Sequence, residues 1–140
     1  MTSYFIAGIM QGSILTSEIH PQEYRDFTKK LILKYDPEAI VYDPFDDFKE
    51  SNVEIETIQK IFEGNVEKAK NCDIVIAYIP KASMGTAIEI FEAKKNGKIV
   101  LVVSELVKNW VVRLYSDQIF PNFDKLENYL KEKAEERNKK

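Results

Sequence analysis

Cysteine and histidine are almost missing from this sequence: Cys72 and His20 are the single residues of their kinds among 140. One cysteine excludes an internal disulfide, and one cysteine with one histidine cannot complete a structural zinc site. Cys72 borders an apolar run, which favours a small buried side chain over a nucleophile. Folds that depend on disulfides or on Cys/His zinc sites are therefore excluded.

Long apolar runs and a dominant charge are missing as well. No apolar run reaches the roughly 18 residues of a membrane span, and the start MTSYFIAGIM lacks the basic segment and cleavage site of a signal peptide. With 20 basic and 23 acidic residues the formal net charge is −3, which gives no global attraction to a polyanion. We therefore expect a cytoplasmic protein with no membrane partner and no polymeric nucleic acid partner.

Five strand-like stretches alternate with helical patterns along the chain. The stretches are SYFIAGI, EAIVY, CDIVIAYI, KIVLVV and a short edge strand DQIF. Pro21 opens the first helix, Asp36-Pro37 ends it, and Asn96-Gly97 ends the helix before KIVLVV. Because the longer strands are apolar on both faces, a parallel sheet covered on both sides is predicted.

The predicted fold class is α/β: a single-domain three-layer α/β sandwich with a five-stranded parallel sheet of the flavodoxin or Rossmann type. The domain is predicted to span residues 1–132, and 133–140 to form a charged, solvated and fraying C-terminal tail. A short helix is expected over 105–113. The residues expected on buried helical faces are Tyr24, Phe27, Leu31 and Tyr35; Ile55, Ile58, Phe62, Val66 and Ala69; Ala87, Ile90 and Phe91; and Phe123, Leu126 and Leu130.

Ligands of such sheets bind beyond the carboxyl ends of the strands, where the strand order reverses. Three predicted loops meet there: 8–13, 43–47 and 80–86. The first contains Gly8 and Gly12 but matches neither the Walker A spacing nor a full dinucleotide fingerprint, so phosphate approach and an ordinary turn both stay open. The third strand ends IAYIP, without the aspartate that a response regulator would need there, which disfavours phosphoacceptor chemistry.

The loop after the second strand contains three aspartates, Asp43, Asp46 and Asp47. Their oxygens could hold a magnesium ion. Because no matching acidic cluster stands elsewhere, a solvated turn with helix-capping acids is the better interpretation, and no metal site is predicted.

The segment KASMGTAIE, residues 81–89, is more informative. Gly85 permits close backbone approach, Thr86 is expected to begin a helix, and Glu89 to lie in its first turn, where the helix dipole favours the carboxylate form. An ionised carboxylate kept nearly dry at a pocket can act as a nucleophile toward a sugar carbon. From the residues alone, a glutamate that compensates the helix dipole is the simpler interpretation.

Three segments, YFIAG, CDIVIAYIPKASMGTAIEIFEAKKNGKIVLVV and NWVVRLYSD, resemble in this order the nucleoside 2-deoxyribosyltransferase superfamily. That superfamily also contains 2'-deoxynucleoside 5'-phosphate N-hydrolases and pyrimidine nucleotide N-glycosidases. The resemblance covers most of the chain and is strongest over 71–103. It implies a small-molecule nucleoside or nucleotide as substrate, a place in nucleotide salvage, and a homo-oligomer with shared sites.

The resemblance implies roles for individual residues. Glu89 matches the glutamate that attacks the anomeric carbon and holds the sugar as a covalent glycosyl-enzyme. Tyr4 matches the first-strand tyrosine whose hydroxyl orients that carboxylate, although packing against the next helix explains a tyrosine there comparably well. Asn109 matches a transferase residue that reaches a neighbouring subunit's site. Trp110 beside it is either an interface anchor or a core residue.

Two further positions bear on the substrate. Ser83 stands where the transferases have aspartate and the phosphate-accepting hydrolases have serine; a neutral hydroxyl can receive a phosphate that a carboxylate would repel. A serine that satisfies its own turn is the alternative. Asn65 replaces the family's aspartate that handles the nucleobase proton, and an amide cannot act as a general acid. The substrate-binding residues predicted are Gly8, Gln11, Gly12, Asn65, Ser83, Gly85 and Asn109.

The leading prediction is an N-glycosidase that cleaves the base–sugar bond of a ribo- or deoxyribonucleoside 5'-monophosphate through a covalent glycosyl-Glu89 intermediate. The first alternative is a nucleoside 2-deoxyribosyltransferase, in which a second nucleobase replaces water. An alternative of another class is a non-catalytic nucleotide-binding module, in which Asn65 reflects lost chemistry. No metal or organic cofactor is expected, because a carboxylate nucleophile and a stabilised leaving base suffice.

Overall fold

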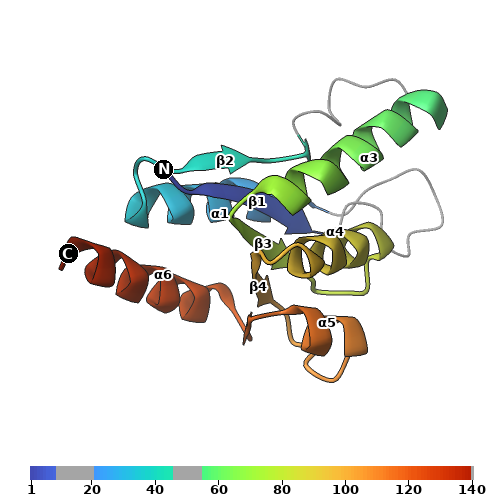
Figure 1. The fold of residues 1–140 in the computed structure, drawn as a ribbon. Coiled ribbons are helices and arrows are strands. Elements are labelled where there is room, and N and C mark those ends of the chain that lie inside the picture. The colour runs from blue at the N-terminus through green and yellow to red at the C-terminus, as the bar shows by residue number, and fades with distance from the viewer. Residues whose placement is uncertain (9–20, 46–54, 140) are drawn as a thin grey trace.

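The centre of the structure, a computed structural model, is a parallel sheet (Figure 1). The structure describes residues 1–8, 21–45 and 55–139, with the side chains of 55–57 excepted. The predictions for Gln11, Gly12, Asp46, Asp47 and the Ile55 side chain therefore lie outside the described residues. The strands are β1 (Ser3–Gly8), β2 (Ile40–Tyr42), β3 (Ile74–Tyr78), β4 (Ile99–Val103) and β5 (Gln118–Phe120).

The strand order is β2-β1-β3-β4-β5, and every neighbouring pair is parallel. This is the flavodoxin-like order, whose switch point lies between β1 and β3. The register pairs Gly8 with Tyr78, so β1 and β3 finish at the same edge of the sheet. The predicted fold class is confirmed, and ligands of a sheet with this order are expected beyond Gly8 and Tyr78.

Helices cover both faces of the sheet and make three layers (Figure 1). The strand β1 shows how the faces are divided, because its side chains alternate: Phe5 and Ala7 join one apolar core, and Tyr4 and Ile6 join the other. The core around Phe5 is covered by α3 (Ile55–Asn71), α4 (Met84–Lys95) and α5 (Trp110–Tyr115), and the core around Ile6 by α1 (Glu23–Tyr35) and α6 (Phe123–Asn138).

Helix α1 turns a different set of residues toward the sheet than its apolar spacing predicts. Arg25 and Thr28 are buried, whereas Phe27 is 49% exposed, so the prediction that Phe27 is buried is wrong. Phe27 instead packs edge-on against Phe123 of α6, with ring centroids 5.2 Å apart. The polar residues are buried because their hydrogen-bonding groups find partners inside: the Thr28 hydroxyl donates to the carbonyl oxygen of Tyr24 at 2.6 Å.

Helix α4 likewise buries polar residues. Thr86 and Glu89 are buried beside Ile90 and Ala93, whereas Phe91, predicted to be buried, is exposed at the side of the helix. The Phe91 ring packs edge-on against Tyr115 of α5, with centroids 4.9 Å apart, so its apolar surface is used between helices. The face of α4 that meets the sheet thus carries a carboxyl group.

Two other elements differ from their predicted bounds or burial. The short helix expected over 105–113 begins at Trp110 as α5. Helix α6 continues to Asn138, so most of the predicted tail is helical, and Arg137 Nη2 donates to the carbonyl oxygen of Tyr35 at 2.7 Å. In α3, Ile58 and Phe62 are more than one third exposed, while Ala69 near its end lies in the core.

Candidate active site

The start of α4 places Glu89 deeper in the helix than predicted. Ser83 is the N-cap: its Oγ accepts a hydrogen bond from the Thr86 amide at 3.4 Å and lies 2.9 Å from Thr86 Oγ1. The helix therefore begins at Met84 and not at Thr86, and its first turn contains no acidic residue. The prediction that Glu89 lies in the first turn is wrong, because the helix begins two residues earlier than expected and Glu89 stands in its second turn.

Glu89 is 9% exposed, on the face of α4 that covers β1, β3 and β4. No ion pair or hydrogen bond joins its carboxyl group to the described residues. Burial raises the pKa of this carboxyl to about 8, and the nearby charge of Arg25 opposes the rise. Burial therefore disfavours the ionised form of Glu89, which the sequence analysis expected the helix dipole to favour.

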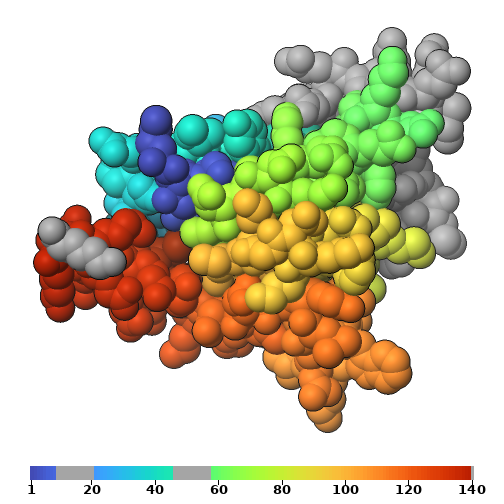
Figure 2. Space-filling view, viewed as in Figure 1, coloured from blue at the N-terminus to red at the C-terminus, as the bar shows by residue number. Residues whose placement is uncertain are grey.

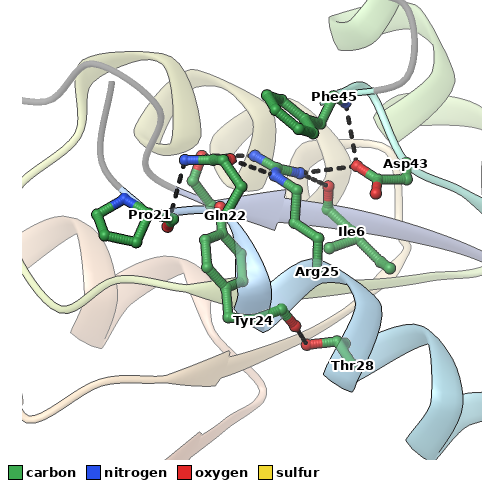
Figure 3. Close-up of polar contacts among 9 residues, drawn as sticks. Ile6, Pro21, Gln22, Tyr24, Arg25, Thr28, Asp43 and Phe45 are labelled. Atoms are coloured by element: carbon green, nitrogen blue, oxygen red, sulfur yellow. Dashed lines mark hydrogen bonds and ion pairs between the residues drawn. The ribbon is translucent and has the colours of Figure 1, made fainter. Parts of the chain in front are cut away.

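Arg25, in the first turn of α1, lies beneath the same edge of the sheet and is 2% exposed (Figure 3). Its Nη1 donates to the Ile6 carbonyl oxygen at 3.2 Å and to Asp43 Oδ1 at 3.1 Å, and its Nη2 donates to the Gly8 carbonyl oxygen at 3.2 Å. Its Nε donates to Gln22 Oε1 at 2.7 Å. The guanidinium therefore joins α1 to the ends of β1 and β2.

Tyr24, the neighbour of Arg25, packs on the last residue of β1. A Cβ atom added to Gly8 would lie 2.2 Å from the Tyr24 hydroxyl oxygen, so a larger residue at position 8 would collide with the phenol. The Tyr24 ring lies against Tyr78 at the end of β3, with centroids 4.8 Å apart. Burial raises the pKa of Tyr24, and the charge of Glu89 contributes to the rise. The Tyr24 phenol thus lies close enough to Glu89 for the charge of Glu89 to affect its pKa.

Tyr4 is not placed to orient Glu89. Its side chain lies in the core on the α1 and α6 side of the sheet, and its hydroxyl donates to Asp36 Oδ2 at 3.2 Å. Burial and the Asp36 carboxylate raise the pKa of Tyr4 to about 12. The predicted contact between Tyr4 and Glu89 is wrong. Tyr4 stands near the beginning of β1, and its side chain lies on the face of the sheet opposite to α4. Packing against the helices of that face, the other explanation given for this tyrosine, is what the structure shows.

Asn65 and Gly85 lie where α3 and α4 pack together. Asn65 is buried on α3, and a Cβ added to Gly85 would lie 3.5 Å from the ring of Phe62, an ordinary contact. Both helices connect parallel strands and run in the same direction. Asn65 is one turn past Phe62, and Glu89 is one turn past Gly85, so Asn65 and Glu89 stand at about the same height in the helix layer.

Asn109 and Trp110 lie at the start of α5. Asn109 is exposed, and its Oδ1 accepts hydrogen bonds from the amides of Val111 at 3.0 Å and Val112 at 3.2 Å. Trp110 is 79% exposed, so core packing, one of the two interpretations of this residue, is excluded within the single chain.

Asp43, in the loop after β2, forms an ion pair with Arg25. Asp43 accepts from Arg25, and its Oδ1 also accepts from the Phe45 amide at 3.0 Å (Figure 3). Within residues 1–8, 21–45 and 55–139, no three His, Cys, Asp or Glu side chains are arranged to hold a metal ion. No helix of this part of the chain is long and apolar enough to cross a membrane.

Tyr24 and Arg25, which lie at this edge of the sheet, are not among the site residues predicted from the sequence. Part of this could be seen in the sequence, because Tyr24 was predicted to lie on a buried helical face. Arg25 beside it is in the first turn of a helix that follows a glycine-containing loop, which places it close to the sheet edge. What was not visible is that the guanidinium points inward, since arginine is among the residues least often buried.

Comparisons with known proteins agree with this fold. No protein-family model and no curated protein sequence matches the chain. Among solved structures, a 2-deoxyribosyltransferase from the psychrotolerant bacterium Bacillus psychrosaccharolyticus matches with a TM-score of 0.68 and 19% identity, over 91% of this chain and 92% of that chain. The CMP N-glycosidase BcmB of Clostridium botulinum matches with a TM-score of 0.50 and 18% identity, over 92% of this chain and 98% of that one. The chain therefore has the fold of these two enzymes over nearly its whole length.

Proposed function

We propose that this protein is an enzyme that cleaves the N-glycosidic bond of a nucleoside 5'-monophosphate, with Glu89 as the nucleophile. The observation that carries the proposal is a buried carboxyl group on the helix that covers β1 and β3, at the switch point of a sheet shared with a deoxyribosyltransferase and an N-glycosidase. Burying a carboxyl group costs free energy, and strongly perturbed titratable groups cluster at functional sites, which makes Glu89 a strong functional candidate.

The reaction has two steps. The Glu89 carboxylate attacks C1' of the sugar, and the C1'–N bond breaks with its electron pair moving to the base, which takes up a proton and leaves. The sugar is then bound to Glu89 as an ester. Water attacks C1' of this ester, so the products are the free base, the sugar 5'-phosphate and the regenerated carboxylate.

Ser83 and Asn65 are proposed to bind two different parts of the substrate. Ser83 and the amides of the first turn of α4 would receive the 5'-phosphate, since they present hydrogen-bond donors at the positive end of a helix. Ser83 already forms hydrogen bonds as the N-cap of α4, but these do not prevent phosphate binding, because a hydroxyl group both donates and accepts hydrogen bonds. Asn65, at the height of Glu89 on α3, would hydrogen-bond the base, and the leaving base takes its proton from water because an amide cannot supply it.

The first prediction concerns the products. Incubation with ribo- and deoxyribonucleoside 5'-monophosphates of each base is expected to give free base and sugar 5'-phosphate, with kcat/KM at least about tenfold higher than for the matching nucleosides, because the phosphate contributes binding energy. Chromatography of the mixtures, with and without a second nucleobase, measures this. A new nucleoside in the mixtures with added base would show the transferase instead, and binding without turnover would overturn the proposal.

Self-association is part of the proposed function, with Asn109 contributed to a neighbouring subunit's site. Figure 2 shows α3, α4 and α5 side by side on one face, in green, yellow and orange. Large apolar side chains are exposed on these helices, which favours burial against a second copy. The most exposed of them are Met84, Trp110 and Leu114.

Replacing Trp110 by glutamate is therefore expected to convert an oligomer into monomers and to lower turnover in parallel. Light scattering coupled to gel filtration measures the mass, and the product assay measures turnover. Lys108→Glu, a charge change two residues away at an exposed position, is the matched control and is expected to leave the mass unchanged. A wild-type protein that is monomeric and active would contradict the shared site.

A further inference from the structure

Arg25 is a buried cation that the proposed reaction does not use. Each described hydrogen-bond partner of its guanidinium is an oxygen atom: the carbonyl oxygens of Ile6 and Gly8, the Asp43 carboxylate and the Gln22 amide oxygen. Its side chain is 2% exposed and that of Asp43 is 8% exposed. A buried ion pair is weak evidence for a stabilising role, because desolvation offsets the attraction between the charges. Its position at the ligand edge of the sheet therefore needs a functional explanation.

The hydrogen bonds of Arg25 fix the end of β1. Two carbonyl oxygens of this strand, those of Ile6 and Gly8, accept from the two terminal nitrogens of the guanidinium. Asp43 accepts from Nη1, the same nitrogen that donates to Ile6, and the Phe45 amide donates to Asp43 (Figure 3). The position of the positive charge is thus set by strands β1 and β2 rather than by a flexible side chain.

Arg25 acts on Glu89 through space. No direct ion pair joins the two among the described residues, yet the guanidinium lowers the pKa of the Glu89 carboxyl against the effect of burial. The other titratable groups described at this edge are Tyr24 from α1, Asp43 after β2 and Tyr78 from β3. Asp43 carries the opposite charge and is bound to Arg25, so it weakens the field of the guanidinium at Glu89.

We propose that Arg25 is a positioning residue of the active site, which holds the end of β1 beside Glu89 and favours the charged form of Glu89, while Asp43 limits the strength of that effect. The proposal rests on the proposed function, in which the ionised form of Glu89 is the nucleophile. It assigns opposite effects to the two members of one ion pair, which separates an electrostatic role from a purely structural one.

The test measures the titration of Glu89 directly and independently of turnover. Carbon-13 NMR of protein labelled at the glutamate carboxyl carbon gives the titration, and Glu89→Gln assigns the signal. The neutral pair Arg25→Gln with Asp43→Asn keeps a hydrogen-bonding side chain at each position and is expected to move the Glu89 midpoint upward by about one pH unit. Asp43→Asn alone is expected to move it downward, and Arg25→Lys, which keeps the charge, to leave it within about 0.3 unit.

A matched control uses the ion pair Lys34–Glu127, which joins α1 to α6 at 3.1 Å on the surface. Lys34→Gln with Glu127→Gln makes the same change of charge away from the sheet edge, and the Glu89 midpoint is expected to stay in place. Circular dichroism shows which variants fold. If Arg25 cannot be replaced without unfolding, the downward shift in Asp43→Asn still decides the question.

The pH profile of kcat/KM provides the second readout. Its lower limb is expected to follow the NMR midpoint in each folded variant. A Glu89 midpoint that stays fixed in Asp43→Asn and in the neutral pair would overturn the inference even with an active enzyme. Midpoints that move as expected in a protein without turnover would instead overturn the proposed function and leave the electrostatic pairing standing.

Discussion

Glu89→Gln is expected to reduce base release by at least about 10³-fold, because the amide has no charge with which to attack C1' and cannot form the glycosyl ester. The substitution keeps the size and shape of the side chain, so binding of the nucleotide is expected to persist. Single-turnover measurements of base release and a separate measurement of nucleotide affinity distinguish the two effects. The control is Glu92→Gln, the same change on the same helix, which is expected to leave turnover within about twofold.

The pH dependence of the wild-type enzyme gives a second result from the same residue. Because burial raises the pKa of Glu89 to about 8, only a minority of molecules hold the nucleophilic carboxylate at neutral pH. The value of kcat/KM is therefore expected to fall roughly tenfold for each pH unit below about 8. A profile that is flat between pH 5 and pH 8 would show either that the nucleophile is another group or that Glu89 is already ionised in the free enzyme.

The difference in stability between the Glu89→Gln variant and the wild type is expected to depend on pH. The folded pKa lies above the ordinary value of 4.5, so protonated Glu89 stabilises the folded state below about pH 4.5, and this stability is lost as the pH rises through about 8. Above pH 8 the folded protein carries a buried, ionised carboxylate that glutamine lacks. The variant is thus expected to melt at a higher temperature than the wild type at pH 9, with a smaller difference at pH 4.5. Equal differences at the two pH values would contradict the raised pKa.

The order of the elements could be predicted because the strands are marked twice, by apolar residues and by the turns that end them. The stretch IVLVV is apolar at every position, which is the pattern of a central parallel strand covered on both faces. The same property hides the orientation of a strand. In SYFIAG the residues after Ser3 are buried on both faces, so nothing local shows that Tyr4 points away from the helix that carries Glu89.

The environment of Glu89 could not be predicted, although the sequence singles out the residue as a candidate. Ser83 and Thr86 are both good helix caps, and the choice of Ser83 moves the helix start and with it the turn in which Glu89 stands. Arg25 is a harder case, because all of its oxygen partners except Gln22 lie 17 to 19 residues away along the chain, in β1 and after β2. A buried arginine is favourable only where the fold brings such oxygen atoms together. The residues next to Arg25 in the sequence do not indicate these contacts.

Gly8→Ala is expected to destabilise the protein by roughly 1–3 kcal/mol, the usual cost of overpacking. The added methyl group would lie 2.2 Å from the Tyr24 hydroxyl oxygen and 2.7 Å from two carbon atoms of that ring, so the ring has to move. The ring cannot move freely, because Tyr78 packs against it with centroids 4.8 Å apart. Thermal and urea unfolding of the variant measure the loss.

Two other glycines provide matched controls. At Gly64, on the exposed side of α3, an added Cβ meets nothing within 4 Å, so Gly64→Ala is expected to stabilise the helix by up to about 1 kcal/mol. At Gly85 the added Cβ makes an ordinary 3.5 Å contact with Phe62, so Gly85→Ala is expected to keep the stability of the wild type. If Gly85→Ala is stable but inactive, backbone approach to a ligand explains that glycine.

The same logic separates the two explanations of Gly8, which the sequence analysis placed in the substrate site and the structure places against Tyr24. If packing against the phenol requires glycine, Tyr24→Ala should relieve the collision, and a double-mutant cycle of Gly8→Ala with Tyr24→Ala is expected to show a coupling energy of about 1–3 kcal/mol. If ligand approach requires glycine, Gly8→Ala leaves the melting temperature unchanged and raises KM, with no coupling to Tyr24 in unfolding. Since the collision exists in the protein without any ligand, we expect the loss of stability to be measured first, and a fully stable Gly8→Ala protein would show that the Tyr24 ring is not fixed where the structure places it.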